Sequence, residues 1–442
     1  MQNLILKYAS YRVGFVGLGI SNMPIAKLFC ENGIDVTLRD KKNQVGDYSG
    51  FKCIFGEDYL NNISEDILFL SPAVRDDLPE LLAARKNGVK ITNELEEFFS
   101  LCPCKTIGVT GSDGKTTTTT LIAKILEHAG KRVFLGGNIG KNLFCELPNI
   151  RPDDFAVCEL SSFQLMKMMH SPNIAILKNI APNHLDWHKD MDEYVDAKKN
   201  IFKYQTSLDL CILGADNEYT NRFACEPKGR VVMTSGEKIL DNGVYFNSDG
   251  IFAFGKKIIS DRDIFLVGRH NRYNYADAIA ATIDFVSPDD VKAIAISFGG
   301  VKHRVQFVCE KNGIKYYNSS MDSSPTRTSA ALNSFDKKVI VICGGYDKKI
   351  PLEPLGELFV RKAKTVVTMG VTGEKIRNIL KNVSYDGNVF SASDMSDAVK
   401  KAESVAKDGD IIILSPAAAS FDMYKNFDER GNAFISEVKN DL

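Results

Sequence analysis

One stretch of the sequence has the residue types of a phosphate-binding loop. Thr110-Gly-Ser-Asp-Gly-Lys-Thr116 follows an apolar, strand-like run at 105–110 and precedes a helical pattern with apolar residues on one face at 121–126. A glycine-rich turn between a strand and a helix surrounds phosphates with backbone N–H groups at the helix N-terminus. We expect Lys115 to contact the β- and γ-phosphates of a bound nucleotide, and the Thr116 hydroxyl to bind Mg²⁺.

The loop departs from the usual G-x-x-x-x-G-K-[ST] spacing, because Val109 stands where the first glycine is required. The alternative is an ordinary glycine turn with a surface lysine. The strand, the Gly-Lys-Thr sequence and the helix together favour the phosphate loop. Nucleotide binding is therefore predicted for Gly111, Ser112, Asp113, Gly114, Lys115, Thr116 and Thr117.

Further polar residues follow later strand-like runs. Glu159 ends the run at 154–158, where its carboxylate could reach a magnesium ion held by the loop. The alternative for Glu159 is a surface or capping role. The segment Asn179–His188 follows another such run and contains His184, His188 and the only tryptophan. For an isolated histidine the alternative is a structural role.

The N-terminal segment has a weaker nucleotide signature. Gly17-Leu-Gly-Ile-Ser-Asn22 has two of the three glycines of the dinucleotide fingerprint, and Asp40 lies near the position of the ribose-binding acid. Asn22 replaces the third glycine, which argues against close packing of the helix on the strand. A purely structural turn and a nucleotide-like ligand both remain open.

These residues need elements that bring strand ends together. Strand-like runs alternate with helical patterns along the chain, which predicts parallel sheets covered by helices. Short strands between glycine and asparagine turns at 229–268 predict a small antiparallel insert. The other runs are at 12–17, 34–38, 67–70, around 91, 105–110, 154–158, 174–177, 210–213, 338–343, 365–369 and 410–414.

Length and composition limit the possible classes of protein. At about 150 residues per domain, the 442 residues predict three α/β domains, at 1–102, 103–301 and 302–442. The first and third are expected to be Rossmann-like and the central one to be a P-loop ATPase domain with a parallel sheet. The formal net charge of −1 gives no field to attract nucleic acid or an anionic membrane.

Targeting signals and cysteine usage predict a cytoplasmic protein. The N-terminus lacks a cationic leader, and no stretch approaches the ~18 apolar residues of a membrane helix. Ten scattered cysteines fit a reducing compartment. Cys102 and Cys104 are expected to be buried thiols and not zinc ligands, because no second pair or histidine stands at zinc spacing.

Taken together, the motifs resemble those of the Mur ligase family, the ATP-dependent enzymes that add amino acids to the peptidoglycan precursor. The matching segments run in family order, and the tail from Leu414 to Gly431 most resembles the members that add D-glutamate. The other matching segments are 110–116, Glu159-Leu-Ser-Ser162, Asn183-His-Leu-Asp186, Gly268-Arg-His-Asn-Arg-Tyr-Asn274 and Lys302-His-Arg304.

The resemblance implies a reaction and its cofactors, ATP and Mg²⁺. The carboxylate of UDP-N-acetylmuramoyl-L-alanine would attack the γ-phosphate to give an acyl phosphate, and the amine of D-glutamate would then displace phosphate. Lys115, Glu159, His184 and Lys198 are implied as catalytic, and Asn271, Asn274 and Arg304 as further ATP contacts. The implied magnesium ligands are Thr116, Glu159, His184 and Lys198, the last as a carbamate; the alternative for Lys198 is a solvated helix lysine.

The resemblance also implies that each outer domain binds one small-molecule substrate, in a monomer whose third domain is mobile. Core packing is the alternative for the phenylalanines of the amino-acid pocket. The implied contacts to the UDP-linked substrate are Gly17, Leu18, Gly19, Ile20, Ser21, Asp40, Lys41, Asn138 and Ser161; those to D-glutamate are Lys348, Ser420, Phe421 and Phe427.

The sequence differs from the family pattern at three positions. Ser319 stands where an acid is usual, Asp322 stands where alanine is common, and Ala73 replaces a glycine in a turn of the first domain. The acceptor therefore stays open: a family ligase of the folate or muramoyl-tripeptide type is the nearest alternative. A nucleotide-dependent switch without ligation and, least favoured, an oxidoreductase are the others.

Overall fold

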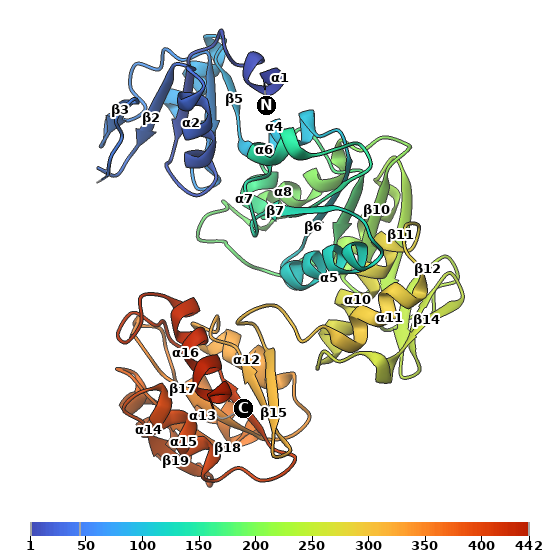
Figure 1. Cartoon of the computed structure of the whole chain (residues 1–442), viewed down its shortest axis with the longest axis vertical. Helices are drawn as coiled ribbons and strands as arrows, with labels where there is room; N and C mark the ends of the chain where they lie inside the picture. Colours follow the sequence, from blue (N-terminus) through green and yellow to red (C-terminus); the bar gives the residue numbers. More distant parts are fainter. Residues whose placement is uncertain (1, 44–45, 441–442) are drawn as a thin grey trace. The chain divides into compact units, whose positions relative to one another are not determined.

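The computed structural model describes residues 2–43 and 46–440, which group into two compact units (Figure 1). One unit comprises Met1–Asp263 and Arg272–Ile294, and the other comprises Ile264–Asn271 and Ala295–Leu442. The fold is α/β, as predicted, with two sheets in the first unit and one in the second. Among the described residues, every helix is too short or too polar to span a bilayer.

The first sheet has five parallel strands in the order β3-β2-β1-β4-β5. Val13 of β1 pairs with Val36 of β2 and with Ile67 of β4. Both β1 and β4 are buried along their whole length, as expected for apolar strands covered on two faces. The elements are α1 (Gln2–Leu6), β1 (Val13–Val16), α2 (Asn22–Glu31), β2 (Val36–Asp40), β3 (Lys52–Phe55), β4 (Ile67–Leu70), α3 (Pro79–Lys86), β5 (Lys90–Thr92) and α4 (Glu94–Leu101).

The central sheet has nine strands in the order β14-β13-β12-β11-β10-β9-β6-β8-β7. Because β6 lies between β9 and β8, the ends of those two strands flank the glycine loop that follows β6. The elements are β6 (Lys105–Thr110), α5 (Lys115–His128), β7 (Val133–Gly137), α6 (Leu143–Glu146), η1 (Leu147–Asn149), β8 (Phe155–Glu159), α7 (Ser162–Leu165), β9 (Ile174–Leu177), α8 (Met191–Lys203), β10 (Leu210–Gly214), α9 (Glu218–Arg222), η2 (Phe223–Cys225), β11 (Arg230–Ser235), β12 (Gly243–Asn247), β13 (Gly250–Ala253), β14 (Lys256–Ser260), η3 (Asp261–Asp263), α10 (Arg269–Thr282) and α11 (Pro288–Ser297).

The predicted antiparallel insert extends the edge of this central sheet. β12, β13 and β14 pair antiparallel, as expected. β11 differs from the prediction, because it pairs parallel to β10 with Leu210 opposite Arg230, and β12 continues parallel to it. The antiparallel part therefore begins one strand later than its sequence pattern indicates.

The sheet of the second unit has six strands in the order β15-β16-β20-β17-β18-β19, and only β15 among them is antiparallel to its neighbour. Alternate residues of β17 enter opposite cores: Val341 packs with residues of α12 to α14, and Ile342 packs with residues of α15 and α16. The elements are β15 (Gln306–Lys311), β16 (Ile314–Asn318), α12 (Pro325–Asn333), β17 (Val339–Cys343), α13 (Pro354–Lys362), β18 (Ala363–Thr368), α14 (Gly373–Asn382), β19 (Asn388–Ser391), α15 (Met395–Glu403), β20 (Ile411–Leu414) and α16 (Phe427–Lys439).

One hydrophobic core runs through both sheets of the first unit. Phe69 of β4 and Phe29 of α2 both pack edge-on against Phe144 of α6, with ring centroids 6.0 and 5.8 Å apart. The Asn142 amide donates to the Ser21 carbonyl at 2.7 Å, which adds a polar tie between the same two regions. These contacts explain why the two sheets fall in one compact unit.

Candidate functional site

The glycine loop after β6 is held by the residues that follow β9. The backbone N–H of Ser112 donates to the Asn179 carbonyl, and the N–H of Asp113 donates to the Asn179 side-chain oxygen, both at 2.9 Å. The Ser112 hydroxyl bonds to the backbone of Ala181 and to the Tyr194 hydroxyl. The first half of the loop is thus fixed by the protein's own contacts.

The second half of the loop depends on Gly114, which caps α5 with a left-handed backbone at φ +79°. A Cβ added there would lie 2.4 Å from Oδ1 of Asn274 on α10, so only glycine fits. The same Asn274 oxygen accepts a hydrogen bond from the Thr118 hydroxyl at 3.2 Å. The structure therefore brings Asn274, a residue predicted to contact the nucleotide, directly against the loop.

Lys115 begins α5, and its side chain folds back over the loop. Its Nζ donates to the carbonyls of Gly111 and Ser112 at 2.9 and 3.1 Å. Thr116 is half-buried and Thr117 is buried in the same helical turn. The ammonium group thus lies over the loop, at the end of the helix that favours anions.

Lys198 lies on α8 and reaches the same loop from the interior. Its Nζ donates to the Gly111 carbonyl at 2.9 Å and to the Thr110 hydroxyl at 3.3 Å. Burial, reinforced by the positive charge of Lys115, holds the pKa of Lys198 well below its usual value, while the charges of Asp113 and Glu159 oppose that shift. Lys198 is therefore not the solvated helix lysine that was the alternative.

Glu159 ends β8 and is buried beside Asn138. The Asn138 side-chain amide donates to Glu159 Oε1 at 2.9 Å, and the Asn138 backbone N–H donates to the Glu159 carbonyl at 2.8 Å. The second carboxylate oxygen, Oε2, is buried and has no hydrogen-bond partner among the described residues. A buried carboxylate oxygen without a partner is the kind of group that a divalent cation would satisfy.

His184 lies in the loop between β9 and α8 with φ +56°, and its ring packs edge-on against Phe163 at 5.0 Å. His188 is buried instead, with Nε2 2.9 Å from the Ser162 hydroxyl. Desolvation lowers the pKa of His188, although the nearby carboxylate of Glu193 opposes that shift. The two histidines of this segment thus have different surroundings. The buried, hydrogen-bonded position of His188 indicates a structural role.

Ser161, predicted to contact the UDP-linked substrate, forms a capping box at the start of α7. Its hydroxyl bonds to the Gln164 side chain at 2.9 Å and accepts from the Gln164 N–H at 3.3 Å. In this structure the hydroxyl therefore caps the helix.

The glycine turn of the first sheet connects β1 with α2. The N–H groups of Leu18 and Lys42 both donate to the Asp40 carboxylate at 2.8 Å, so this acid shapes the turn. Gly17 has φ +82°, and Lys41 lies 3.5 Å from Glu57 in an exposed ion pair. The remaining predicted contacts, Gly19, Ile20 and Ser21, lie in the turn, and Ile20 is 88% exposed.

Asn22 corrects the expectation drawn from the missing third glycine. It is fully buried, and its amide donates to the carbonyls of Val16, Gly17 and Phe69 at 2.9 to 3.2 Å. The side chain ties α2 to the ends of β1 and β4. Helix and strand are thus held together by hydrogen bonds, where the dinucleotide fingerprint uses a glycine.

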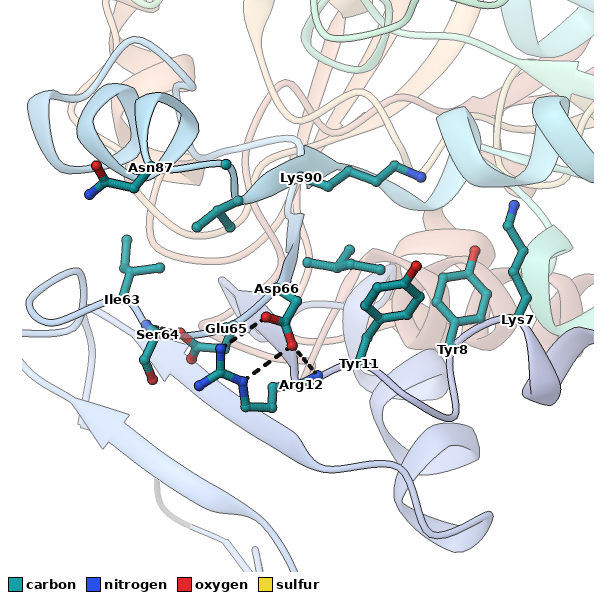
Figure 2. Close-up of a pocket in the computed structure, with 13 residues that line it drawn as sticks. Lys7, Tyr8, Tyr11, Arg12, Ile63, Ser64, Glu65, Asp66, Asn87 and Lys90 are labelled. Atoms are coloured by element: carbon teal, nitrogen blue, oxygen red, sulfur yellow. Dashed lines mark hydrogen bonds and ion pairs between the residues drawn. The ribbon is translucent and has the colours of Figure 1, made fainter.

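A separate pocket of about 660 Å³ lies at the N-terminal ends of β1, β4 and β5 in the first sheet (Figure 2). Arg12 and Asp66 pair across its floor, and Lys7, Tyr11 and Lys90 lie along one side. None of the predicted site residues lines it. The turn at 17–21 follows β1, so the predicted UDP site lies at the C-terminal ends of the strands, away from this pocket.

In the second unit, the residues predicted to bind D-glutamate lie on loops that follow β17 and β20. A bridge between Tyr346 and Ala419 joins these loops, and the Phe421 ring packs edge-on against Tyr346 at 6.0 Å. Lys348 and Phe421 are exposed. Ser420 is buried, and its carbonyl accepts from the N–H groups of Met423 and Tyr424 in the turn that precedes α16. Phe427 begins α16 and is 38% exposed.

Asn271 and Arg304 also belong to the second unit. The Asn271 amide donates to the Val267 carbonyl at 2.6 Å. Arg304 is half-buried, and its charge acts on Asp322.

The two unusual residues of this unit are both buried. Ser319 accepts a hydrogen bond from the Val305 N–H at 3.1 Å. Asp322 accepts one from the Ser415 hydroxyl at 2.8 Å, and desolvation raises the pKa of its carboxyl to about 6 despite this bond. The Ser319 hydroxyl is therefore occupied by the Val305 N–H. The nearby carboxylate belongs to Asp322, three residues later.

The sequence reasoning missed several residues that shape these sites. Arg430, fully buried on α16, donates to Ser320 and to the carbonyls of Ala418 and Ala419, and so fixes the loop that carries Ser420. Asn179 lies in the segment 179–188, but no function was predicted for it. Its position directly after a buried strand next to the loop strand was the signal that could have identified it.

Two family models match most of the chain. The Mur ligase middle domain matches residues 109–282, and the glutamate ligase domain of Mur ligases matches residues 303–418. Among curated proteins, the UDP-N-acetylmuramoylalanine–D-glutamate ligase of Clostridium kluyveri is 46% identical, covering 98% of this chain and 97% of the relative. The enzyme of the same name from Acetivibrio thermocellus is 45% identical, covering 99% and 97%.

Solved structures support the fold. The UDP-N-acetylmuramate-alanine ligase of Thermotoga maritima superposes with a TM-score of 0.60 at 21% identity, covering 98% of this chain and all of that one. A pseudomurein peptide ligase from Methanothermus fervidus gives a TM-score of 0.53 at 16% identity, covering 97% and 100%. At these identities the likeness concerns the fold alone.

Proposed function

The chain belongs to the Mur ligase family, and we propose that it joins D-glutamate to UDP-N-acetylmuramoyl-L-alanine in the synthesis of the peptidoglycan precursor. It is an ATP-dependent ligase. A carboxylate oxygen of the UDP-linked substrate attacks the γ-phosphorus of ATP, which releases ADP and leaves an acyl phosphate. The amine of D-glutamate then attacks the acyl carbon, and inorganic phosphate leaves as the amide forms.

The observation that carries this proposal is the group of charges around the glycine loop. Lys115 folds over the loop, and Lys198 reaches it from the interior. The reaction requires a carboxylate to approach a triphosphate, so repulsion between anions is a large part of its barrier. Lys115 would lower that repulsion by exchanging its two carbonyl contacts for phosphate oxygens.

The residues present fit a bound magnesium ion. Glu159 Oε2 is buried without a partner, and Lys198 has the depressed pKa of an amine that can be neutral, the form that adds CO₂ to become a carbamate oxygen ligand. We assign Thr116, Glu159, His184 and carbamylated Lys198 as the ligands. Bound magnesium would neutralise charge on the phosphate oxygens.

The ATP contacts in this proposal are the loop and its neighbours. The first turn of α5, where a helix leaves N–H groups unpaired, supplies backbone donors for phosphate. Ser112 and Asp113 act by shaping the loop, since their N–H groups are held by Asn179. The set is Gly111, Ser112, Asp113, Gly114, Lys115, Thr116, Thr117, Asn271, Asn274 and Arg304.

The two other substrates are assigned to the outer regions. The turn at 17–21, shaped by Asp40 and accompanied by Lys41, Asn138 and Ser161, binds the UDP-linked substrate. Lys348 offers a cation to the carboxylates of D-glutamate, with Ser420, Phe421 and Phe427 around it. Each of the three sheets lies within one of the ranges 1–102, 103–301 and 302–442, which supports the same division into substrate domains.

In this proposal the enzyme acts in the cytoplasm, where ATP and UDP-linked precursors are available, and it acts as a monomer. Light scattering of the purified protein tests the monomer, with a mass near 49.0 kDa as the expected result and twice that mass as the contrary one.

The acceptor is tested by ADP release with UDP-N-acetylmuramoyl-L-alanine and a panel of D- and L-amino acids. D-Glutamate should give turnover well above every other amino acid. Equal rates with L-glutamate, L-lysine or no acceptor would overturn the assignment. Mass spectrometry of the product controls for ATP hydrolysis without ligation.

A further inference from the structure

A buried ion pair lies beneath the glycine loop. Lys178, the residue directly after β9, pairs through Nζ with Oδ2 of Asp277 on α10, and each side chain is only 3% exposed. The other carboxylate oxygen of Asp277 accepts from the Thr234 hydroxyl at 2.7 Å. The pair therefore joins β9, α10 and β11 in the interior of the central domain.

The two loop glycines with positive φ, Gly111 and Gly114, pack closely against the Lys178 side chain. A Cβ on Gly114 would lie 2.6 Å from Lys178 Cε, and a Cβ on Gly111, whose φ is +152°, would lie 3.1 Å from Lys178 Cβ. The Lys178 N–H also donates to the carbonyl of Thr110, the last residue before the loop, at 3.1 Å. Contacts with Lys178 thus constrain the backbone path of the loop.

The partner of Lys178 is equally well placed. Asp277 follows Asn274 by three residues, so both side chains lie on one face of α10. Asn274 Oδ1 lies 2.4 Å from the position of a Gly114 Cβ and accepts from Thr118. The ion pair and Asn274 therefore fix α10 against the loop from two adjacent positions.

A buried ion pair is a weak source of net stability, because removing two charges from water offsets most of their attraction. Hydrophobic residues of similar volume would serve stability as well. A pair that sets the spacing between a binding loop and the helix beside it has a different use, since it fixes geometry.

We propose that Lys178 and Asp277 are positioning residues for ATP: the pair holds the phosphate loop and α10 at the spacing that the triphosphate requires, with the ammonium directed to Asp277. This inference rests on the proposed function, because it concerns the same ATP site. It adds two residues that act through Gly111, Gly114 and Asn274.

The test compares Lys178→Met and Asp277→Asn with the wild type in steady-state assays and in direct ATP binding by equilibrium dialysis. We expect the KM and Kd for ATP to rise at least tenfold in both variants, while the KM for the UDP-linked substrate changes less than twofold. The double variant should lose less than the product of the two single losses, because neither charge is then left unpaired.

The matched control is the Arg39–Glu65 pair of the first sheet, which is equally buried at 1% and 3% exposed. Arg39→Met should lower the melting temperature and leave the Kd for ATP within twofold. Should Lys178→Met fail to fold, Asp277→Asn, which preserves shape, carries the test alone. An unchanged Kd for ATP in folded Asp277→Asn, with only a lower melting temperature, would overturn the positioning role.

The same assays separate this inference from the proposed function. Wild-type enzyme that forms no amide with D-glutamate would contradict the function. Wild-type enzyme that is active, with variants that bind ATP normally, would contradict only the positioning role.

Discussion

The phosphate loop and the predicted amino-acid pocket differ in how far the protein itself fixes them. In the loop, Ser112, Asp113 and Lys115 are all engaged by neighbouring groups, and Asn179 holds two N–H groups in place. In the amino-acid pocket, Lys348 and Phe421 are exposed on loops. The proposed ATP loop is thus held by the protein's own contacts, whereas the proposed recognition of D-glutamate depends on exposed side chains of loops, one of which has its backbone fixed by Arg430.

The change expected to have the largest effect is Lys115→Ala in the phosphate loop. Turnover should fall by roughly 10³-fold or more, because a cation that stabilises transferring phosphate is lost, while binding of the UDP-linked substrate stays intact. Steady-state kinetics and calorimetric titration measure the two quantities. Lys124→Ala, an exposed lysine of the same helix, is the control. Loss of UDP-substrate binding together with turnover would contradict the domain assignment.

The second change tests whether the loop needs its shape. Gly114→Ala should raise the KM for ATP by roughly 10²-fold, a loss of about 3 kcal/mol, because a Cβ would clash with Asn274 and Lys178. Gly130→Ala, at the other end of α5, has a similar φ of +76° and nothing within 4 Å. It shares the backbone cost of about 1–2 kcal/mol but should leave the KM for ATP unchanged. Equal effects of the two alanines on that KM would show that the clash is irrelevant.

The third change tests the predicted D-glutamate pocket on the loops that follow β17 and β20. Lys348→Ala should raise the KM for D-glutamate by about tenfold, the effect of losing one charge-assisted hydrogen bond, with the KM for ATP unchanged. Initial rates at varied D-glutamate measure this. Lys381→Ala, an exposed lysine of α14, is the matched control. A change in both KM values would mean that the two regions are not independent.

The smallest effect on turnover is expected for Asp322→Asn. Burial raises the pKa of this carboxyl to about 6 from 3.8, so the folded state binds its proton more tightly than the unfolded state. The resulting loss of stability sets in as pH rises from about 4 and is complete above about 6. Asparagine avoids it and should stabilise the protein by about 1–3 kcal/mol at pH 7, but not at pH 4.

Urea denaturation between pH 4 and 7 checks this prediction, with Asp386→Asn, at an exposed aspartate, as the control. A difference between Asp322→Asn and the wild type that stays constant over this range would contradict the raised pKa.

The strands around the site could be predicted from sequence because each buried parallel strand is a continuous apolar run. The runs at 67–70, 105–110 and 174–177 became β4, β6 and β9 with the same ends. Edge strands such as β3 and β19 were missed, since their exposed residues break the apolar pattern. The parallel pairing of β11 could be seen only in the structure, because the residues of a strand do not specify the direction of the strand beside it.

The candidate site was predictable to the extent that its residues lie close together in sequence. Lys115 and Thr116 follow from the local loop pattern, and the structure brings Asn274 and Lys198 to the same loop. Lys178 and Asp277 are 99 residues apart, and no local pattern pairs them. Their role depends on strand order, which places β9 beside β6.

In the proposed reaction, the γ-phosphate of ATP passes to the substrate carboxylate before D-glutamate attacks. The most direct measurement uses UDP-N-acetylmuramoyl-L-alanine with ¹⁸O in the alanine carboxylate and follows the label by mass spectrometry. One labelled oxygen should appear in the inorganic phosphate released for each amide formed. Amide formation with unlabelled phosphate would contradict the claim.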